Sequence, residues 1–252
     1  TAAGAIQTIS REVRPGLFHA VIGSFGQLGL VTRARSQLTK LHSGLFEAKA
    51  VAASDLGDLL RQLDDARDDW EYVVGWLDAF PGGAKLGRGL LHFARHLTAD
   101  EDPDPVASLD PAGQDLPANL FGVIPKSLMW RMMKPFTNNL GMRAVNLAKY
   151  LQGSTIADGA VYRQSLAAFS FLLDYVPDWK KAYLPGGLIQ HQSFVPAAEA
   201  ERVFAIQLEI CRRRGMSSYL GVLKRHRPDP FLLTHAVDGC SRARDFPVVA
   251  SK

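Results

Sequence analysis

The chain has 252 residues, of which 47% are hydrophobic and 21% are charged. These values are typical of a globular protein with a sizeable core, and no apolar run approaches the roughly eighteen residues of a membrane-spanning helix. The net charge of +4 is mild and the basic residues are dispersed, which argues against nucleic-acid binding.

The first residues, TAAGAIQTIS, lack the basic and apolar regions of a signal peptide, and the chain does not begin with methionine. We therefore expect a piece of a longer polypeptide. The two cysteines, Cys211 and Cys240, show neither metal-ligand spacing nor a disulfide framework. This usage agrees with a reducing compartment, so we expect a cytoplasmic protein without a metal site.

Three evenly spaced glycines, Gly23, Gly26 and Gly29, mark the first predicted elements. They follow a short helix predicted for PGLFHAVI and precede a strand-like run, LGLVTRARSQLTKL. Glycine permits a positive φ and the close approach of a ligand, so the turn is a candidate for nucleotide contact. Because a Rossmann turn runs from strand to helix, the order here excludes that motif. A tight structural turn is the alternative.

Two similar units follow, each predicted as strand, helix, strand and strand. The first unit covers strands at 45–53, 70–79 and 87–97 and a helix at 54–68 that Ser54 caps. The second unit covers strands at 186–195, 217–226 and 240–249 and a helix at 197–214. Two such units predict an α+β fold, in which one antiparallel sheet carries helices on a single face.

The region between the units differs in composition. Residues 99–118 are rich in proline and aspartate and lack apolar periodicity, which predicts an exposed loop. Residues 126–152 carry methionine, tryptophan, phenylalanine and leucine at helical spacing and predict a helical insert broken at Pro135. Core or interface packing is the preferred interpretation of these apolar residues. A surface facing lipid or a hydrophobic substrate is the alternative.

The stretch ISREVRPGLFHAVIGSFGQLGLVTRARSQL resembles the end of the FAD-binding domain in PCMH-type flavoenzymes of the vanillyl-alcohol-oxidase family. The resemblance implies that residues 1–43 close an FAD-binding domain. It places Gly29, Leu30 and Val31 near the cofactor, with Gly23 and Gly26 shaping the approach.

Four later segments resemble the decaprenylphosphoryl-ribose oxidase branch of that family and its sugar and sterol oxidoreductase relatives. They are WLDAFPGGAKLGRGLL, YRQSLAAFSFLLDYVPDWKKAYLPGGLIQHQSFVP, SSYLGVLKRHRPD and DGCSRARDFPV. The resemblance implies that residues 44–252 form a substrate-binding cap domain, preceded by the last strands of the FAD-binding domain. It further implies oxidation of an alcohol carbon of a sugar or polyol by hydride transfer to flavin.

Strand alternation places Gln190 and Gln192 on one face of one strand, and Lys224 on one face of another with Leu220, Val222 and His226. Amide and ammonium groups can hydrogen-bond a hydroxylated substrate and the electron-rich edge of a reduced flavin. The resemblance implies catalytic roles for Lys224 and Gln192 and substrate contacts for Gln190 and Trp76. A surface lysine and solvent-facing glutamines are the alternative.

Two histidines of these strands are weaker candidates. The basic neighbours of His226 indicate a solvated turn, and His191 lies on the face opposite the glutamines, which favours a structural role.

Two arginines depart from the family pattern. Arg242 and Arg244 stand where the relatives have apolar residues, and burying two guanidinium groups is costly. We therefore expect an exposed edge strand or a perturbed strand end there.

The family's pyrophosphate-binding strands and its second flavin-facing lysine motif fall outside these 252 residues. We therefore expect the chain alone not to hold FAD in the family's manner, and to depend on an upstream FAD-binding segment or a partner reductase. A second function class stays open, a non-catalytic substrate- or partner-binding module that keeps the cap fold without flavin.

Overall fold

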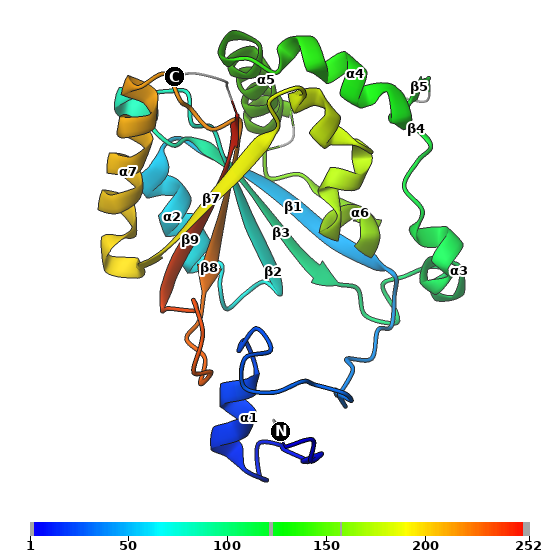
Figure 1. The fold of residues 1–252 in the computed structure, drawn as a ribbon. Coiled ribbons are helices and arrows are strands. Elements are labelled where there is room, and N and C mark those ends of the chain that lie inside the picture. The colour runs from blue at the N-terminus through cyan, green and yellow to red at the C-terminus, as the bar shows by residue number, and fades with distance from the viewer. Residues whose placement is uncertain (1–2, 121–122, 157, 249–252) are drawn as a thin grey trace.

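Figure 1 shows the fold in a computed structural model, which describes residues 3–120, 123–156 and 158–248. Seven antiparallel strands form one open sheet in the order β6-β1-β3-β2-β8-β9-β7. They are β1 (Leu45–Ala53), β2 (Tyr72–Leu77), β3 (Gly89–His96), β6 (Val161–Ser165), β7 (Leu188–Pro196), β8 (Leu220–His226) and β9 (Gly239–Pro247). Two short strands, β4 (Asn119–Leu120) and β5 (Ile124–Pro125), pair separately. The predicted α+β class and antiparallel sheet are confirmed.

The described helices that pack on this sheet occur on both of its faces, so the prediction of helices on a single face is wrong (Figure 1). They are α1 (Pro15–Val21), α2 (Leu56–Asp65), α3 (Pro105–Leu109), α4 (Met129–Met133), α5 (Asn139–Leu151), α6 (Leu166–Ser170) and α7 (Ala197–Arg213). The cap of α2 differs from the prediction. Asp55, not Ser54, is its N-cap, because the Asp55 carboxylate accepts a hydrogen bond from the Asp58 backbone N–H at 2.9 Å.

The main core lies between the sheet and the helices α2 and α7. Both helices present apolar residues at intervals of three or four, so each buries one stripe against the strands. These residues are Leu56, Leu59 and Leu63 of α2 and Ala200, Phe204 and Leu208 of α7. They meet Leu77, Leu91 and Leu223 of the sheet, and full burial of each large side chain contributes about 1.5–3 kcal/mol.

The opposite sheet face meets helices from the region between the two units. Phe169 of α6 packs edge-on against Phe46 of β1, with ring centroids 5.4 Å apart. Lys149 of α5 lies over Trp76 of β2. The helices α2 and α7 thus share one face, while α5 and α6 lie against the other (Figure 1).

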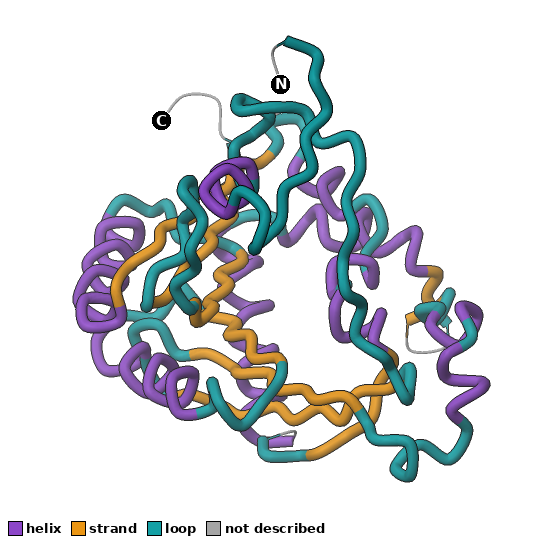
Figure 2. Tube along the Cα trace, turned by 90° about the horizontal axis from the view of Figure 1, so that it is seen from below, coloured by secondary structure: helices purple, strands orange, loops and turns teal. Residues whose placement is uncertain are grey.

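The chain before β1 forms α1, as predicted, but no strand follows among its described residues. The prediction of a strand after the glycines is wrong there, because no neighbouring strand offers backbone partners to this stretch. Figure 2 shows loop leading towards the sheet. The region touches the β8–β9 loop, where the Leu232 backbone N–H donates to the His19 carbonyl at 3.4 Å.

The stretch 99–118 is mostly exposed but contains α3 and a short 3-10 helix at Pro111–Gln114. Asp104 and Asp110 cap these helices, which explains the aspartates before Pro105 and Pro111. Asp102 is buried. The helical insert is interrupted around Pro135, as predicted, by the 3-10 helix Lys134–Phe136.

The expectation of an exposed edge for Arg242 and Arg244 is wrong, because β9 lies between β8 and β7. The Arg242 side chain is fully buried under α7 and donates to the Phe204 carbonyl at 3.2 Å and to Gln207 Oε1 at 3.1 Å. Burial, and secondarily the charge of Arg244, lowers the pKa of Arg242 to about 9. Arg244 donates to His191 Nδ1 at 2.7 Å. His191 therefore makes a structural contact, as predicted from its position on the strand face opposite the glutamines.

Candidate functional site

The sheet face opposite α2 and α7, which we call the open face, carries Trp76, Gln190, Gln192 and Lys224. Strand register gives the relative positions of these side chains on the face. Trp76 pairs with Val222, Val222 with Ala243, and Ala243 with Gln192, so one cross-strand row joins β2, β8, β9 and β7. At about 4.8 Å per strand, Trp76 and Gln192 stand roughly 14 Å apart along this row.

The two glutamines are held by polar side chains of the central strand β9. Gln190 Nε2 donates to Asp245 Oδ1 at 2.9 Å, and Gln192 Nε2 donates to Ser241 Oγ at 3.2 Å. Asp245 is buried, which raises the pKa of its carboxyl although the Gln190 hydrogen bond opposes the shift. Because these hydrogen bonds hold the NH₂ group of each glutamine, they also fix the orientation of its amide oxygen.

The expectation that His226 lies in a solvated turn is wrong. His226 is the last residue of β8, and its Nε2 lies 2.6 Å from Ser241 Oγ. Burial lowers the pKa of its imidazole, and the charges of His235, Lys224 and Arg225 act in the same direction. His226 is thus a partly buried member of the open face.

Lys224 is exposed in the middle of this polar group. It pairs across the strands with Ser241, which in turn pairs with Phe194. Among the described residues it has neither an ion pair nor a hydrogen bond. Its ammonium is therefore available to a ligand above the sheet.

Lys149 and His92 also belong to the open face, and sequence reasoning missed both. The Lys149 ammonium lies 4.5 Å from the centre of the Trp76 ring, which leaves Trp76 only 5% exposed. The Lys149 side chain is exposed, yet desolvation by the surrounding protein lowers the pKa of its ammonium to about 8. Burial, and secondarily the charge of Lys149, lowers the pKa of His92 to about 4. Alternation in LLHFARH marks the face of His92, but no sequence signal places α5 over Trp76.

The candidate cofactor residues lie apart from this group, in the N-terminal region. Gly23, Gly26 and Gly29 all have positive φ, of 79°, 78° and 155°. A Cβ on Gly23 would stand 2.5 Å from the Leu233 carbonyl oxygen, which makes this glycine necessary for packing against the β8–β9 loop. A Cβ on Gly26 or Gly29 would meet no atom within 4 Å. Leu30 and Val31 are exposed.

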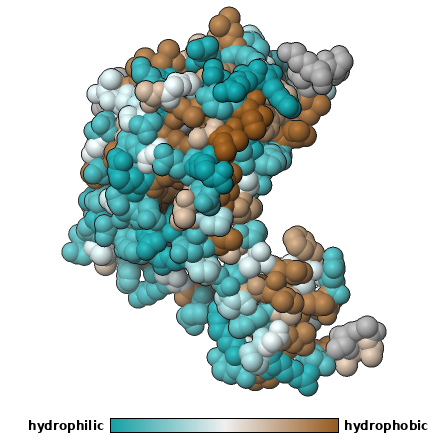
Figure 3. Space-filling model, turned by 90° about the vertical axis from the view of Figure 1, so that its left-hand side faces the viewer, coloured by the Kyte–Doolittle hydropathy of each residue, from teal (hydrophilic) through white to brown (hydrophobic). Residues whose placement is uncertain are grey.

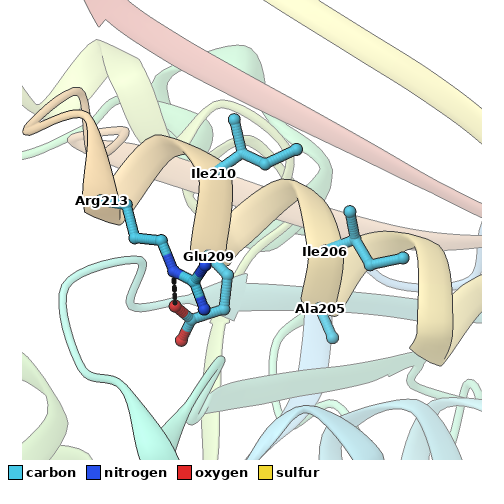
Figure 4. A pocket seen from close by; sticks show the side chains of 5 residues that line it. All are labelled: Ala205, Ile206, Glu209, Ile210 and Arg213. Carbon is cyan, nitrogen blue, oxygen red and sulfur yellow. Dashed lines mark ion pairs between the residues drawn. The ribbon is translucent and has the colours of Figure 1, made fainter.

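A space-filling view shows the molecule hollowed between its main body and the N-terminal part (Figure 3). Two surface pockets lie elsewhere. One, of about 330 Å³, runs along α7 beside Ile206 and Ile210, with an ion pair between Glu209 and Arg213 (Figure 4). This shallow apolar strip offers no reactive group.

The second pocket, of about 310 Å³, is lined by Asp78, Arg88 and Arg143 among others. The buried Asp78 carboxylate pairs with Arg88 at 2.9 Å, so Arg88 already neutralises the negative charge of this pocket. Neither pocket contains a predicted site residue. Within residues 3–120, 123–156 and 158–248, no group of three or more histidine, cysteine, aspartate or glutamate side chains could hold a metal ion. No helix of that same part is long and apolar enough to cross a membrane.

No protein-family model matches the sequence. The chain is 26% identical to decaprenylphosphoryl-beta-D-ribose oxidase of Mycolicibacterium smegmatis over 238 residues, which cover 93% of the chain and 49% of that protein. It is 32% identical over 103 residues, 41% of the chain and 28% of the relative, to a Streptomyces coelicolor protein described as an uncharacterized protein in mprA 5'region. The chain thus spans about half the length of the first relative. It is a distant homologue of an oxidase.

Proposed function

We propose that this chain is the substrate-binding part of an FAD-dependent oxidoreductase, which oxidises an alcohol carbon of a sugar, polyol or related hydroxylated substrate. One observation carries the proposal: Lys224, Gln190, Gln192 and Trp76 share one sheet face although they belong to three strands, and the three polar side chains are exposed there. The similarity to an oxidase of a ribose derivative supports the same class.

The residues of the open face fit one side of a flavin ring. An unpaired ammonium and two anchored amides are suitable donors and acceptors for its polar edge. The turn at Gly26 and Gly29 also fits a close approach, because positive φ and open space coincide there. Bound FAD would supply the hydride acceptor for oxidation of the alcohol carbon.

Each residue then has a distinct role in this proposal. With FAD bound, Lys224 would stabilise the negative charge that develops on the flavin as it accepts the hydride, which would lower the barrier because the charge develops in the transition state. Gln192 and Gln190 hydrogen-bond substrate hydroxyl groups, and their contacts with Ser241 and Asp245 fix their orientation. Trp76 forms the floor of the site beneath Lys149.

The N-terminal region supports the need for an FAD-binding segment. None of the apolar side chains of residues 3–43 is buried, and those exposed by more than 80% are Ile6, Phe25, Leu30 and Leu38. We propose that residues 1–43 pack within an FAD-binding domain, as the resemblance implies, or against a partner reductase.

The test is the flavin content of the full-length gene product and its response to substrate. We expect purified protein with flavin absorbance, which anaerobic addition of a suitable sugar or polyol bleaches. Protein that binds hydroxylated ligands but contains no flavin, and gains none on incubation with FAD, would instead support the non-catalytic module.

A further inference from the structure

The helical insert has an unusual charge pattern. Residues 116–157 contain no aspartate or glutamate, although the whole chain has 25 such residues in 252. The same stretch contains five basic residues, which are Lys126, Arg131, Lys134, Arg143 and Lys149. None of these five forms an ion pair with a described residue. The insert is therefore a region of uncompensated positive charge.

The α5 helix directs one apolar side away from the sheet. Met142 and Asn146 are buried toward the sheet, and Lys149 on the same side reaches Trp76. At 100° per residue, the opposite side carries Leu140, Leu147 and Leu151, which are between 42% and 80% exposed. A globular helix normally directs its apolar side inward. The outward apolar side of α5 therefore has no packing partner within the described part of the chain.

Exposed apolar residues also occur on α4 and on the 3-10 helices Lys126–Leu128 and Lys134–Phe136 that flank it. Leu128, Met132 and Phe136 are between 39% and 51% exposed. Together with Leu140, Leu147 and Leu151 they are the exposed apolar residues of the helical insert, and we call this set of six the insert face. In Figure 1, α4 and α5 lie at the end of the molecule opposite the N-terminal part.

Cations surround the ring of Trp130, which is partly buried on the side of α4 away from Met132. The Arg131 guanidinium lies 5.1 Å from the centre of the Trp130 ring, and Lys181 Nζ lies 5.8 Å from the same centre. Lys181 belongs to the 3-10 helix Trp179–Tyr183, where Asp178 pairs with it at 2.8 Å. Exposed leucine, methionine and phenylalanine side chains close to lysine and arginine are typical of helices that lie in a membrane interface.

We propose that the insert face docks on an anionic phospholipid surface. Its apolar side chains enter the interface, and Lys126, Arg131 and Lys134 lie at the level of the acidic headgroups. A second copy of the chain is disfavoured as the occupant, because a symmetric contact would bring the same cations together without acidic partners. The inference does not depend on the proposed enzymatic activity.

The test is co-sedimentation of the 252-residue chain with vesicles of phosphatidylcholine alone or mixed with phosphatidylglycerol. We expect binding to the mixed vesicles at least tenfold tighter than to the neutral ones, with the difference reduced by salt because exposed charges are screened. The double variant L140E/L147E should lose at least tenfold in affinity. The control I206E/I210E, which changes exposed isoleucines on α7, should bind like the original chain.

Folding of each variant is checked by circular dichroism, and brominated lipids provide a second measurement. They should quench a tryptophan introduced on the insert face by Leu140→Trp, but not one introduced on α7 by Ile206→Trp. Equal affinity for neutral and mixed vesicles, undiminished binding of the L140E/L147E variant, or equal quenching of the Leu140→Trp and Ile206→Trp variants would overturn the proposal. A concentration-dependent dimer that L140E/L147E abolishes would also overturn it and identify a second copy as the occupant.

Discussion

The ammonium of Lys149 lies 4.5 Å from the centre of the Trp76 ring and so joins the helical insert to the open face of the sheet. His92, on the same face, is affected by this ammonium, which is the second cause of its lowered pKa after burial. The contact makes the electrostatics of the open face depend on the position of α5.

The Lys149→Met variant should therefore raise the pKa of His92, because the substitution removes a nearby positive charge. The pKa should remain below 6.5, since burial persists. A pH titration of the His92 ring by NMR measures the change, with Lys85→Met as a control at an exposed site. An unchanged His92 pKa would show that α5 does not hold Lys149 over the sheet.

Stability should fall as the pH drops from 6.5 toward 4, because unfolded His92 gains a proton that the folded site resists. Because the pKa of His92 is lower in the folded protein than in the unfolded chain, this loss of stability is absent above pH 6.5. Below pH 4 it amounts to at most about 3 kcal/mol. Urea unfolding across this range should show a shallower pH dependence for His92→Gln. Parallel pH profiles for the two proteins would contradict the assigned pKa.

The Arg242→Met variant should leave the free energy of unfolding unchanged or raise it by up to about 3 kcal/mol. The guanidinium is fully buried without a carboxylate partner, and its Nε has no hydrogen-bond partner among the described residues. Urea unfolding measures the effect. Arg242→Lys keeps the charge but loses the pair of hydrogen bonds to the Phe204 carbonyl and Gln207 Oε1, so it should destabilise the protein. A loss of more than about 2 kcal/mol in Arg242→Met would mean that the hydrogen bonds outweigh the desolvation cost.

The Gln192→Ala variant of the flavin-loaded enzyme should raise KM about fivefold and change kcat little. A neutral amide contributes a hydrogen bond of about 1 kcal/mol, which acts on bound substrate and transition state alike. Steady-state kinetics separate the two constants. A large loss in kcat with unchanged KM would assign Gln192 to the chemical step instead.

Much of the fold follows from local patterns. The alternation in LIQHQSF and LGVLKRH predicts β7 and β8 and the faces of their side chains, because one face of each strand packs on a helix. The spacing of Leu56, Leu59 and Leu63 predicts α2 for the same reason. Such patterns report which side of an element is buried, and the structure agrees at these positions.

Other features depend on partners that are distant in sequence. The interior position of β9 follows from its pairing with β7 and β8, and the polar residues Arg242 and Arg244 gave no sign of it. Likewise, nothing in the sequence of α5 shows that Lys149 lies over Trp76, since the two are joined only by tertiary packing. The roles of Lys224 and the glutamines came from resemblance, and they stay predictions.

The most direct test of the central claim, that the open face meets flavin and substrate, is the rate of anaerobic flavin reduction in the Lys224→Met variant. The measurement uses the flavin-loaded full-length enzyme, with Lys85→Met as the matched control outside the open face. Removing the ammonium should slow reduction by about two orders of magnitude or more, while flavin content and the unfolding transition stay unchanged. Reduction of the Lys224→Met variant at the rate of the control would contradict the claim and leave Lys224 as a solvated strand residue.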